Sequence, residues 1–385
     1  MAAGAVVSAP GGPVEVVDGI EVEPPRAGEA LVAIEAAGVC GSDLAVASGK
    51  MRYPMPVILG HEAAGRVLAL GPGTDGPPPD ARVVLWMRPP CRACRMCLRE
   101  KAELCERSGA MSAKGVLADG RTGVTKGGAP LFRAFGVGAF TGQVVMPVAG
   151  LVEVPDDVPT EVAALLSCGV ATGAGAVLNV ARPEPGDVVL VLGGGGVGLA
   201  AVMAAASSGA AAVVVADPSP GRRELALELG ATAAIPGGDR QAVKAQLRDA
   251  LGDGVVDVAL DCVGRPDLVE LAYRTVRQGG AVVAVGLHDG DATVTLPGWM
   301  LPLSHKRILG CFMGGVDPQR DLPLLFDLYR RGGLPVDRMI TARRPLAEVP
   351  EAVADLAAAR GLRTIIDLSP EQGQGPLEGR RPDVR

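Results

Sequence analysis

The stretch DVVLVLGGGGVGLAAVMAAASSGAAAVVVAD, residues 187–217, predicts a buried strand, a glycine turn, a helix and a second buried strand. Continuous apolar strands that alternate with helices are typical of a parallel sheet covered on both faces. Gly193, Gly195 and Gly198 form a G-x-G-x-x-G pattern, which directly follows the first strand and opens the helix. Further strand–helix units follow, so this part of the chain is predicted to be a doubly wound α/β domain.

The glycine pattern favours a dinucleotide site, because these glycines allow a tight turn and close approach of a pyrophosphate to a helix N-terminus. Asp217 ends the second strand, where a carboxylate can accept hydrogen bonds from ribose hydroxyls. A 2′-phosphate would meet this negative charge, so NAD is favoured over NADP, although Arg222 and Arg223 can pair with such a phosphate. A glycine-rich turn without a ligand is the alternative.

The first 150 residues or so have a different texture, with short strands separated by turns. Residues 29–37 and 82–86 are extended, and residues 71–80 form a loop rich in glycine and proline. This pattern predicts an antiparallel, barrel-like β domain. Residues 160–178 are alanine-rich and favour helix, and after about residue 297 helical segments precede a strand at 364–368.

Composition excludes several classes of function. The net charge is -6 and the charges are interspersed, which disfavours a nucleic-acid or membrane-surface partner. We expect no secretory signal and no membrane span, since the apolar stretches are only strand-length. The protein is therefore expected in the cytoplasm, where stable disulfides are rare, and its 8 cysteines need another explanation.

Four cysteines crowd into CRACRMCLREKAELC, residues 91–105. Cys91, Cys94, Cys97 and Cys105 have the spacing C-x2-C-x2-C-x7-C, and four thiolates suit a closed tetrahedral structural zinc site. Scattered core cysteines would not cluster in a charged segment, and an iron–sulfur cluster is the other alternative. A zinc-ribbon module that binds nucleic acid is disfavoured by the acidic balance and by the glycine turn.

A second set of candidate metal ligands is dispersed along the chain: Cys40 in GVCGSD, His61 in GHE and Cys168 in SCGVATG. His61 and Glu62 are two adjacent polar residues in an apolar run, where polar groups need a reason to be buried. Two thiolates and one imidazole would leave a fourth zinc position open, as catalytic sites require. Their spacing in sequence does not establish that they meet in space.

Together these motifs resemble the zinc-dependent medium-chain alcohol dehydrogenases, over about residues 10–368, with a C-terminal part similar to bacterial members related to class III. The motifs are GVCGSD, GHEAAG, the four-cysteine segment, SCGVATG, LGGGGVG with Asp217, and LRTIID. The resemblance implies a GroES-like catalytic domain over residues 1–169 and 313–385, with a structural-zinc lobe at 88–108. A Rossmann NAD-binding domain over residues 170–312 interrupts it, and residues 370–385 are expected to form a disordered tail.

The resemblance also implies two zinc ions per chain, NAD, and a role for each matching residue. Cys40, His61 and Cys168 would hold the catalytic zinc, which polarises the substrate oxygen, while Ser42 relays the proton. Asp43 would fix the His61 ring, and Glu62 would be the carboxylate near the zinc. The residues expected to contact the cofactor are Gly193, Gly195, Gly196, Val197, Gly198, Asp217, Arg222 and Arg363.

The implied activity is hydride transfer between NAD and an alcohol, or the matching aldehyde or ketone, in a homodimer or homotetramer. Alternatives are a thiol-adduct formaldehyde dehydrogenase, an alcohol oxidoreductase with tightly bound NAD, and a redox-dead scaffold. The Gly109 and Met51 regions lack the charged residues with which class III enzymes grip glutathione, which disfavours the thiol adduct. Met87 and Ala134 stand where aromatic residues often narrow the pocket, so we hypothesise a roomier site.

Asp261 and His288 follow strand ends in the predicted Rossmann half. They are either close to the cofactor or ordinary loop residues, and the sequence leaves both possibilities open.

Overall fold

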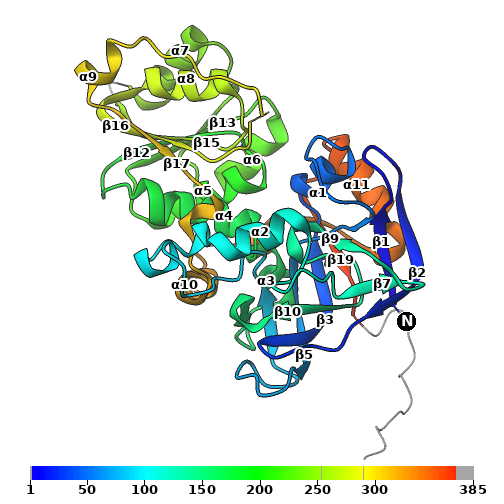
Figure 1. Ribbon diagram of the computed structural model, residues 1–385. Coiled ribbons are helices and arrows are strands. Elements are labelled where there is room, and N and C mark those ends of the chain that lie inside the picture. The colour runs from blue at the N-terminus through cyan, green and yellow to red at the C-terminus, as the bar shows by residue number, and fades with distance from the viewer. Residues whose placement is uncertain (1, 253, 289, 370–385) are drawn as a thin grey trace, which may run out of the picture.

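The computed structural model describes residues 2–252, 254–288 and 290–369 (Figure 1). The tail expected at 370–385 lies outside the described residues. One part of the molecule is built on a parallel sheet flanked by helices, and the other is rich in antiparallel strands (Figure 1). The α/β fold class with a barrel-like part and a Rossmann part is confirmed.

The parallel sheet has six strands in the order β14-β13-β12-β15-β16-β17, and every neighbouring pair is parallel. The order reverses at β12, as it does in doubly wound sheets that bind dinucleotides. Its strands are β12 (Val188–Leu192), β13 (Ala212–Ala216), β14 (Ala233–Ile235), β15 (Val256–Asp261), β16 (Val276–Ala284) and β17 (Arg307–Gly310). Its helices are α5 (Gly196–Ser207), α6 (Pro220–Glu228), α7 (Arg240–Leu251), α8 (Pro266–Thr275) and α9 (Met300–Ser304).

The other part contains two sheets, with strand orders β8-β7-β2-β1-β4-β9 and β11-β6-β5-β3-β19-β18, and β10 pairs with β3. β19 lies near the end of the described chain and pairs antiparallel with β3. The β-rich part therefore combines chain segments that precede and follow the parallel-sheet part in the sequence. Its strands are β1 (Ala2–Val7), β2 (Val14–Val22), β3 (Glu29–Gly38), β4 (Val57–Ile58), β5 (Glu62–Leu70), β6 (Arg82–Leu85), β7 (Val124–Lys126), β8 (Ala129–Pro130), β9 (Phe132–Arg133), β10 (Gln143–Pro147), β11 (Leu151–Glu153), β18 (Ile340–Pro345) and β19 (Arg363–Asp367). The remaining helices are α1 (Gly41–Ala47), α2 (Glu106–Lys114), α3 (Thr160–Leu166), α4 (Gly169–Gly175), α10 (Pro318–Arg330) and α11 (Val349–Ala357).

The alanine-rich run at 160–178 is not one helix. α3 ends at Leu166, α4 begins at Gly169, and Cys168 between them has φ -148° and ψ -86°, outside the helical region. Ser167 holds the break, because its hydroxyl accepts a hydrogen bond from Ala63 N (3.1 Å) and donates one to Ala164 O (2.7 Å). The break directs Cys168 out of the helix.

Among the described residues, no single helix is both long and apolar enough to cross a membrane. One bent pair, residues 160–166 with 169–181, meets the length and composition criteria only when its two helices are taken together.

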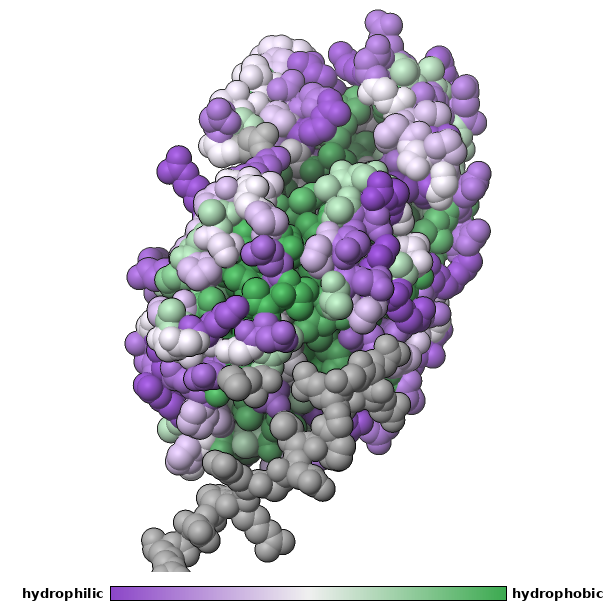
Figure 2. Space-filling model, turned by 90° about the vertical axis from the view of Figure 1, so that its right-hand side faces the viewer, coloured by the Kyte–Doolittle hydropathy of each residue, from purple (hydrophilic) through white to green (hydrophobic). Residues whose placement is uncertain are grey.

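The core is made mainly of alanine, valine and leucine, as the 3% share of aromatic residues requires. It runs without interruption from the β-rich part through α4 and α5 to the parallel sheet. Gly173 permits the close packing of α4 on α5, since a Cβ at Gly173 would lie 2.0 Å from Val197 O. On the face shown in Figure 2, hydrophobic residues gather along the hollowed middle, between the upper and lower parts of the view.

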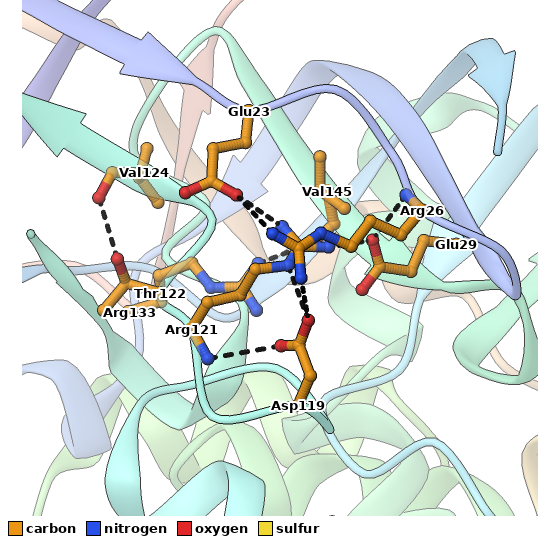
Figure 3. A network of polar contacts seen from close by, with 9 residues as sticks. All are labelled: Glu23, Arg26, Glu29, Asp119, Arg121, Thr122, Val124, Arg133 and Val145. Atoms are coloured by element: carbon orange, nitrogen blue, oxygen red, sulfur yellow. Dashed lines mark hydrogen bonds and ion pairs between the residues drawn. The ribbon is translucent and has the colours of Figure 1, made fainter.

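A polar network braces one side of the β-rich part (Figure 3). The Arg121 guanidinium pairs with Glu23, Glu29 and Asp119, and so ties the β2–β3 connection to the loop before β7. Beside it, the fully buried Arg133 donates from Nη1 to Val145 O (2.5 Å), and burial lowers the pKa of Arg133 to about 10. Arg133 immediately precedes the short helical turn Ala134–Gly136, which lies beside the candidate site.

Candidate functional site

Four side chains from distant parts of the chain come together where α4 leads from the β-rich part to α5. They are Cys40, His61, Glu62 and Cys168, whose potential ligand atoms all lie within 4.8 Å of one another. Cys40 immediately precedes α1, and His61 immediately precedes β5, whose first residue is Glu62. Cys168 lies in the break between α3 and α4. We call these four residues the mixed cluster.

Asp43, in the first turn of α1, organises the mixed cluster from behind and is fully buried. Its Oδ2 accepts a hydrogen bond from Cys40 N (3.1 Å), and its Oδ1 accepts one from Gly60 N (3.0 Å). Oδ1 also lies 3.0 Å from His61 Nδ1. This contact fixes the orientation of the imidazole and leaves Nε2 as its free edge.

His61 Nε2 is the atom that tests whether a metal fits. It is buried and has no hydrogen-bond partner within the described part of the chain, whereas Nδ1 is held by Asp43. A buried polar atom without a partner is costly, but a metal ligand needs one free nitrogen lone pair. Two thiols and a carboxylate lie within reach of it, and this soft, nitrogen- and sulfur-rich donor set suits zinc.

The charges of the mixed cluster favour an ionised sulfur on one of its two cysteines, Cys40. A hydrogen bond with Cys168, helped by the positive charges of His61 and Arg363, lowers the pKa of the Cys40 thiol well below its usual value, although burial opposes the shift. Burial also tends to lower the pKa of His61, but the charges of Asp43 and Cys40 outweigh it, so the pKa is raised. The same hydrogen bond acts on Cys168 in the other direction and, together with burial, raises the pKa of its thiol well above the usual value. The cluster thus favours one thiolate, on Cys40, beside a second sulfur whose proton a divalent cation would have to displace.

Glu62 links the mixed cluster to the start of α4 and to Arg363. Its Oε1 accepts a hydrogen bond from Gly169 N (3.2 Å), and its Oε2 forms a buried ion pair with Arg363 Nη2. Burial raises the pKa of Glu62 to about 7, although the Arg363 charge opposes the shift. Arg363 lies at the start of β19, and a Cβ at Gly196 would be 3.3 Å from its Nη1. Arg363 therefore lies between Glu62 and the N-terminus of α5.

The glycine turn has the geometry that close approach of a phosphate needs. Gly193 has φ +99°, a conformation that favours glycine, and a Cβ at Gly198 would lie only 1.8 Å from Gly193 O. Asp217 follows β13 and is buried, with Oδ2 accepting a hydrogen bond from Gly194 N (2.7 Å). Arg222 Nη1 lies 3.7 Å from the same oxygen. Gly195 caps α5, and Gly196 and Val197 form its first turn.

The second cysteine group is compact and mostly half-buried. Cys91, Cys94, Cys97 and Cys105, which we call the four-cysteine lobe, bring their sulfurs within 4.8 Å of one another, and only Cys105 is buried. Cys91 N donates to Cys105 Sγ and Cys94 N donates to Cys91 Sγ, both at 3.3 Å. Burial raises the pKa of Cys105, but hydrogen bonds from Ser108 and Cys91 outweigh this and lower the pKa to about 6. All eight cysteines of the chain are described, and all are free thiols.

An aromatic pair that the sequence analysis missed lies against the mixed cluster. The Phe135 ring packs on the His61 ring with centroids 4.6 Å apart, and Tyr53 packs on Phe135 at 5.9 Å. The Tyr53 hydroxyl contacts Ser112 O and lies 3.1 Å from Arg133 O. Phe135 has φ +54°, an uncommon conformation for a bulky residue, so the surrounding structure imposes it. The glycine after Phe135 was the only signal in the sequence for such a turn.

These contacts limit the hypothesis of a roomier pocket. Met87 and Ala134 are buried in the core, but the neighbouring Phe135 supplies an aromatic wall beside His61. Ser42 lies half-buried in the first turn of α1, two residues after Cys40. The structure brings together the predicted ligands and Asp43, and it connects Arg363 with both the cluster and α5. Asp217 and Arg222 lie away from the mixed cluster, after the carboxyl end of β13.

Comparison with known proteins identifies the two parts of the chain. Residues 26–156 match the family model described as alcohol dehydrogenase GroES-like domain, and residues 196–331 match the one described as zinc-binding dehydrogenase.

Related proteins match nearly the whole chain. An NDMA-dependent alcohol dehydrogenase from Amycolatopsis methanolica is 35% identical over 365 residues, which is 94% of this chain and 97% of the relative. An S-(hydroxymethyl)glutathione dehydrogenase from Komagataella pastoris is 32% identical, covering 91% of this chain and 94% of the relative. Among solved structures, benzyl alcohol dehydrogenase from Acinetobacter calcoaceticus superposes with a TM-score of 0.89 at 28% identity, covering 96% of this chain and 99% of that one.

Proposed function

The chain belongs to the zinc-binding alcohol dehydrogenase family, and on that premise we propose that it is a zinc- and NAD-dependent alcohol dehydrogenase. The reaction converts an alcohol and NAD⁺ into the aldehyde or ketone, NADH and a proton, or runs in reverse. A hydride leaves the alcohol carbon for the nicotinamide, and the hydroxyl proton leaves for solvent.

One observation carries the proposal: the unpartnered Nε2 of the buried His61 faces two cysteine sulfurs. We assign Cys40, His61 and Cys168 as the ligands of a catalytic zinc, with Glu62 beside them. Zinc held there supplies Lewis acidity to the oxygen of an alcohol or carbonyl, and a bound nicotinamide carries the hydride.

The protein groups then have separate roles. Asp43 keeps the His61 ring in one orientation through its contact with Nδ1. Ser42, with its hydroxyl two residues after Cys40, accepts the proton of the substrate hydroxyl and passes it towards solvent. Phe135 and Tyr53 provide an apolar wall that excludes water from the side of His61.

Contacts on both sides of the glycine turn support NAD as the cofactor. Gly196, Val197 and Gly198 form the first turn of α5 after Gly195, where backbone N–H groups have no partner within the helix and a pyrophosphate is favoured. Gly193 shapes the turn that leads to it. Arg363 beside Gly196 adds positive charge there.

The discrimination between NAD and NADP is proposed to depend on two residues after the carboxyl end of β13, Asp217 and Arg222. Asp217 is positioned to accept hydrogen bonds from ribose hydroxyls, and a 2′-phosphate would have to approach its negative charge. Arg222 lies close enough to Asp217 to be partly neutralised by it, so we expect NAD to bind more tightly than NADP.

The four-cysteine lobe is proposed to hold a structural zinc, which gives two zinc ions per chain. Four thiolates complete a tetrahedral site and leave no position open for a substrate. Backbone N–H groups that already point at Cys91 and Cys105 stabilise their ionised sulfurs.

For partners we propose a second copy of the chain and a small alcohol, aldehyde or ketone, and no nucleic acid or membrane. β17 is at one end of the parallel sheet, and the segment that precedes it exposes Trp299 by 66% and, within α9, Leu301 by 53% and Leu303 by 70%. A paired copy would cover these apolar side chains and the strand edge. Light scattering after gel filtration that gives a monomer mass would contradict this.

The experiment is a substrate panel with purified protein and measured zinc. Ethanol, longer alcohols, benzyl alcohol and secondary alcohols are each assayed with NAD⁺ and with NADP⁺ by absorbance at 340 nm. We expect turnover with NAD⁺ and at least one alcohol. Protein that contains two zinc ions per chain but reduces neither cofactor with any alcohol would overturn the proposed function.

Two arms of the panel address the relatives. One adds NDMA, because a relative 35% identical carries a name that states dependence on it. The other supplies formaldehyde with and without glutathione, because another relative is an S-(hydroxymethyl)glutathione dehydrogenase. Turnover that requires NDMA would indicate an NDMA-dependent alcohol dehydrogenase. Turnover that requires formaldehyde with glutathione would indicate a thiol-adduct formaldehyde dehydrogenase.

A further inference from the structure

Two turns at the carboxyl edge of the parallel sheet carry a pair of polar side chains that the proposed reaction does not use. β15 ends at Asp261, β16 ends at Ala284, and these two residues are register partners on neighbouring parallel strands. His288 lies four residues beyond Ala284. Ligands of open α/β sheets bind at this edge, so unexplained polar groups here are candidates for a role in binding.

Asp261 joins the two turns through its backbone and through one carboxylate oxygen. Its Oδ1 accepts hydrogen bonds from Val263 N (3.0 Å) and Gly264 N (3.2 Å), within its own turn. Its backbone carbonyl accepts hydrogen bonds from Val285 N and Gly286 N, both at 2.9 Å, in the neighbouring turn. The residue is fully buried, so its position is fixed.

The second carboxylate oxygen is not satisfied. Asp261 Oδ2 faces His288 Nε2 at 3.7 Å, and neither atom has a hydrogen-bond partner among residues 2–252, 254–288 and 290–369. Both atoms are shielded from solvent, although the His288 side chain as a whole is 23% exposed. A hydrogen bond needs a separation of about 3 Å, so a movement of less than about 1 Å would form a strong, charge-assisted one. Burial also raises the pKa of Asp261, which fits a carboxylate with too few partners.

The turn after β15 is in direct contact with the glycine turn on one side and with the turn after β16 on the other. A Cβ at Gly193 would lie 2.5 Å from Val263 Cγ2, and a Cβ at Gly286 would lie 2.0 Å from Gly264 N. The glycine turn, the turn after β15 and the turn after β16 are therefore closely packed in series. Val263 is 46% exposed and Leu287, directly before His288, is 66% exposed. These two apolar side chains give the sheet edge beside the glycine turn a hydrophobic surface that a planar ring can cover.

We propose that His288 and Asp261 form a latch for the dinucleotide: when the cofactor covers Leu287 and Val263, His288 moves onto Asp261 and their hydrogen bond fixes the turn at residues 285–288. His288 is then a positioning residue, since it acts on the cofactor through this turn. The step is a hydrogen bond from an imidazole N–H to a carboxylate and involves no transfer of electrons. The inference rests on the proposed function in one respect, namely that the glycine turn holds a dinucleotide.

The test compares three variants in the full-length, zinc-loaded protein. His288→Leu removes the donor, and His288→Gln keeps a side-chain N–H. Gln278→Leu is the matched control, because it replaces an exposed polar side chain near the amino end of β16, the strand that leads to His288. NADH affinity is measured by fluorescence titration, KM for NAD⁺ and kcat by steady-state kinetics, and thermal unfolding without dinucleotide by calorimetry.

We expect His288→Leu to weaken NADH binding about tenfold, the contribution of one hydrogen bond to a charged group. KM for NAD⁺ should rise in parallel while kcat changes less, and His288→Gln should recover most of the loss. The unfolding temperature without dinucleotide should stay unchanged, because at 3.7 Å the bond contributes little. Gln278→Leu should match the wild type in every measurement.

Three results would overturn the inference. If His288→Leu binds NADH as tightly as the wild type, the latch proposal is wrong and the proposed function is unaffected. A fall in unfolding temperature that accompanies the loss of affinity, with no recovery in His288→Gln, makes His288 a structural residue only. A wild type that binds neither NADH nor NADPH removes the proposed function and the latch together.

Discussion

The mixed cluster and the four-cysteine lobe use the same chemical groups in opposite ways. The lobe takes its four sulfurs from fifteen consecutive residues, and three of those cysteines are half-buried. The mixed cluster takes its ligands from three separate elements and buries His61 and Glu62 completely. The lobe therefore depends on the chain nearby, whereas the mixed cluster depends on the whole fold.

Their surroundings differ as well. Backbone N–H groups contact the sulfurs of the lobe, and Arg92 ties it to Asp317 at the start of α10 with contacts of 2.5 and 2.7 Å. Around the mixed cluster the partners are charged or aromatic side chains: Asp43, Arg363 and Phe135. Under the proposed assignment, the structural site needs only the right geometry, whereas the reactive site also needs controlled charge and access.

The largest expected effect is loss of turnover in Cys40→Ser. Without this sulfur the mixed cluster loses a ligand and its charge, so hydride transfer should fall about a thousandfold or more. The unfolding temperature should change little, because Cys40 is held in place by Asp43 through its backbone. NAD⁺ reduction and calorimetry measure the two properties.

Cys311→Ser is the control, since Cys311 belongs to neither group of ligands. Equal turnover in Cys40→Ser and Cys311→Ser would show that the mixed cluster is not where the reaction takes place.

The opposite pattern is expected for Cys97→Ser in the lobe. Loss of a structural metal removes folding free energy, so the unfolding temperature should fall by about 5–15 °C. Turnover per folded molecule should stay within about threefold of the wild type, because a closed site takes no part in the chemistry. A variant with normal stability and no activity would reverse the assignment of the two sites.

Tyr53 connects the two regions, because it bonds to α2 beyond the lobe and packs on Phe135 beside the mixed cluster. Burial raises its pKa from 10.0 to about 12. The unfolded chain therefore ionises this tyrosine first, and stability that is present below pH 10 is lost as the pH rises towards 12. From pH 9 to 12 the wild type should lose about 2 kcal/mol more than Tyr53→Phe, by urea unfolding. Parallel pH profiles would contradict the burial of this hydroxyl.

The smallest effect is expected for Arg92→Ala, which removes the link from the lobe to α10. The Arg92 side chain is 47% exposed, so its loss should cost about 1 kcal/mol or less and leave turnover unchanged. Urea unfolding provides the value, and Arg99→Ala is a control within the same lobe. A cost as large as that of Cys97→Ser would mean that the lobe depends on α10 more than on a metal.

The features that could be predicted from the sequence are those that depend on one short segment of the chain. The glycine turn and the cysteine spacing each lie in one short segment, and the structure forms both as that segment requires. The meeting of Cys40, His61 and Cys168 was expected only from the family resemblance, since no local rule joins residues so far apart. The break at Cys168 was missed because the alanine-rich residues around it favour helix, while the hydrogen bond from Ala63 to Ser167 acts across the fold.

Two further features were only partly indicated by the sequence. The left-handed conformation of Phe135 depends on its contacts with His61 and Tyr53, which belong to other elements. The pairing of His288 with Asp261 depends on β15 and β16 being neighbours in the sheet. In both cases the tertiary structure, and not the local chain, determines what the side chain faces.

The most direct test is the zinc content per chain, determined by mass spectrometry on preparations whose turnover is also known. The account predicts two zinc ions in the wild type and one each in Cys40→Ser and Cys97→Ser, with activity lost only in Cys40→Ser. A wild type with a single zinc that Cys97→Ser abolishes, or an active Cys40→Ser with its full metal content, would contradict it.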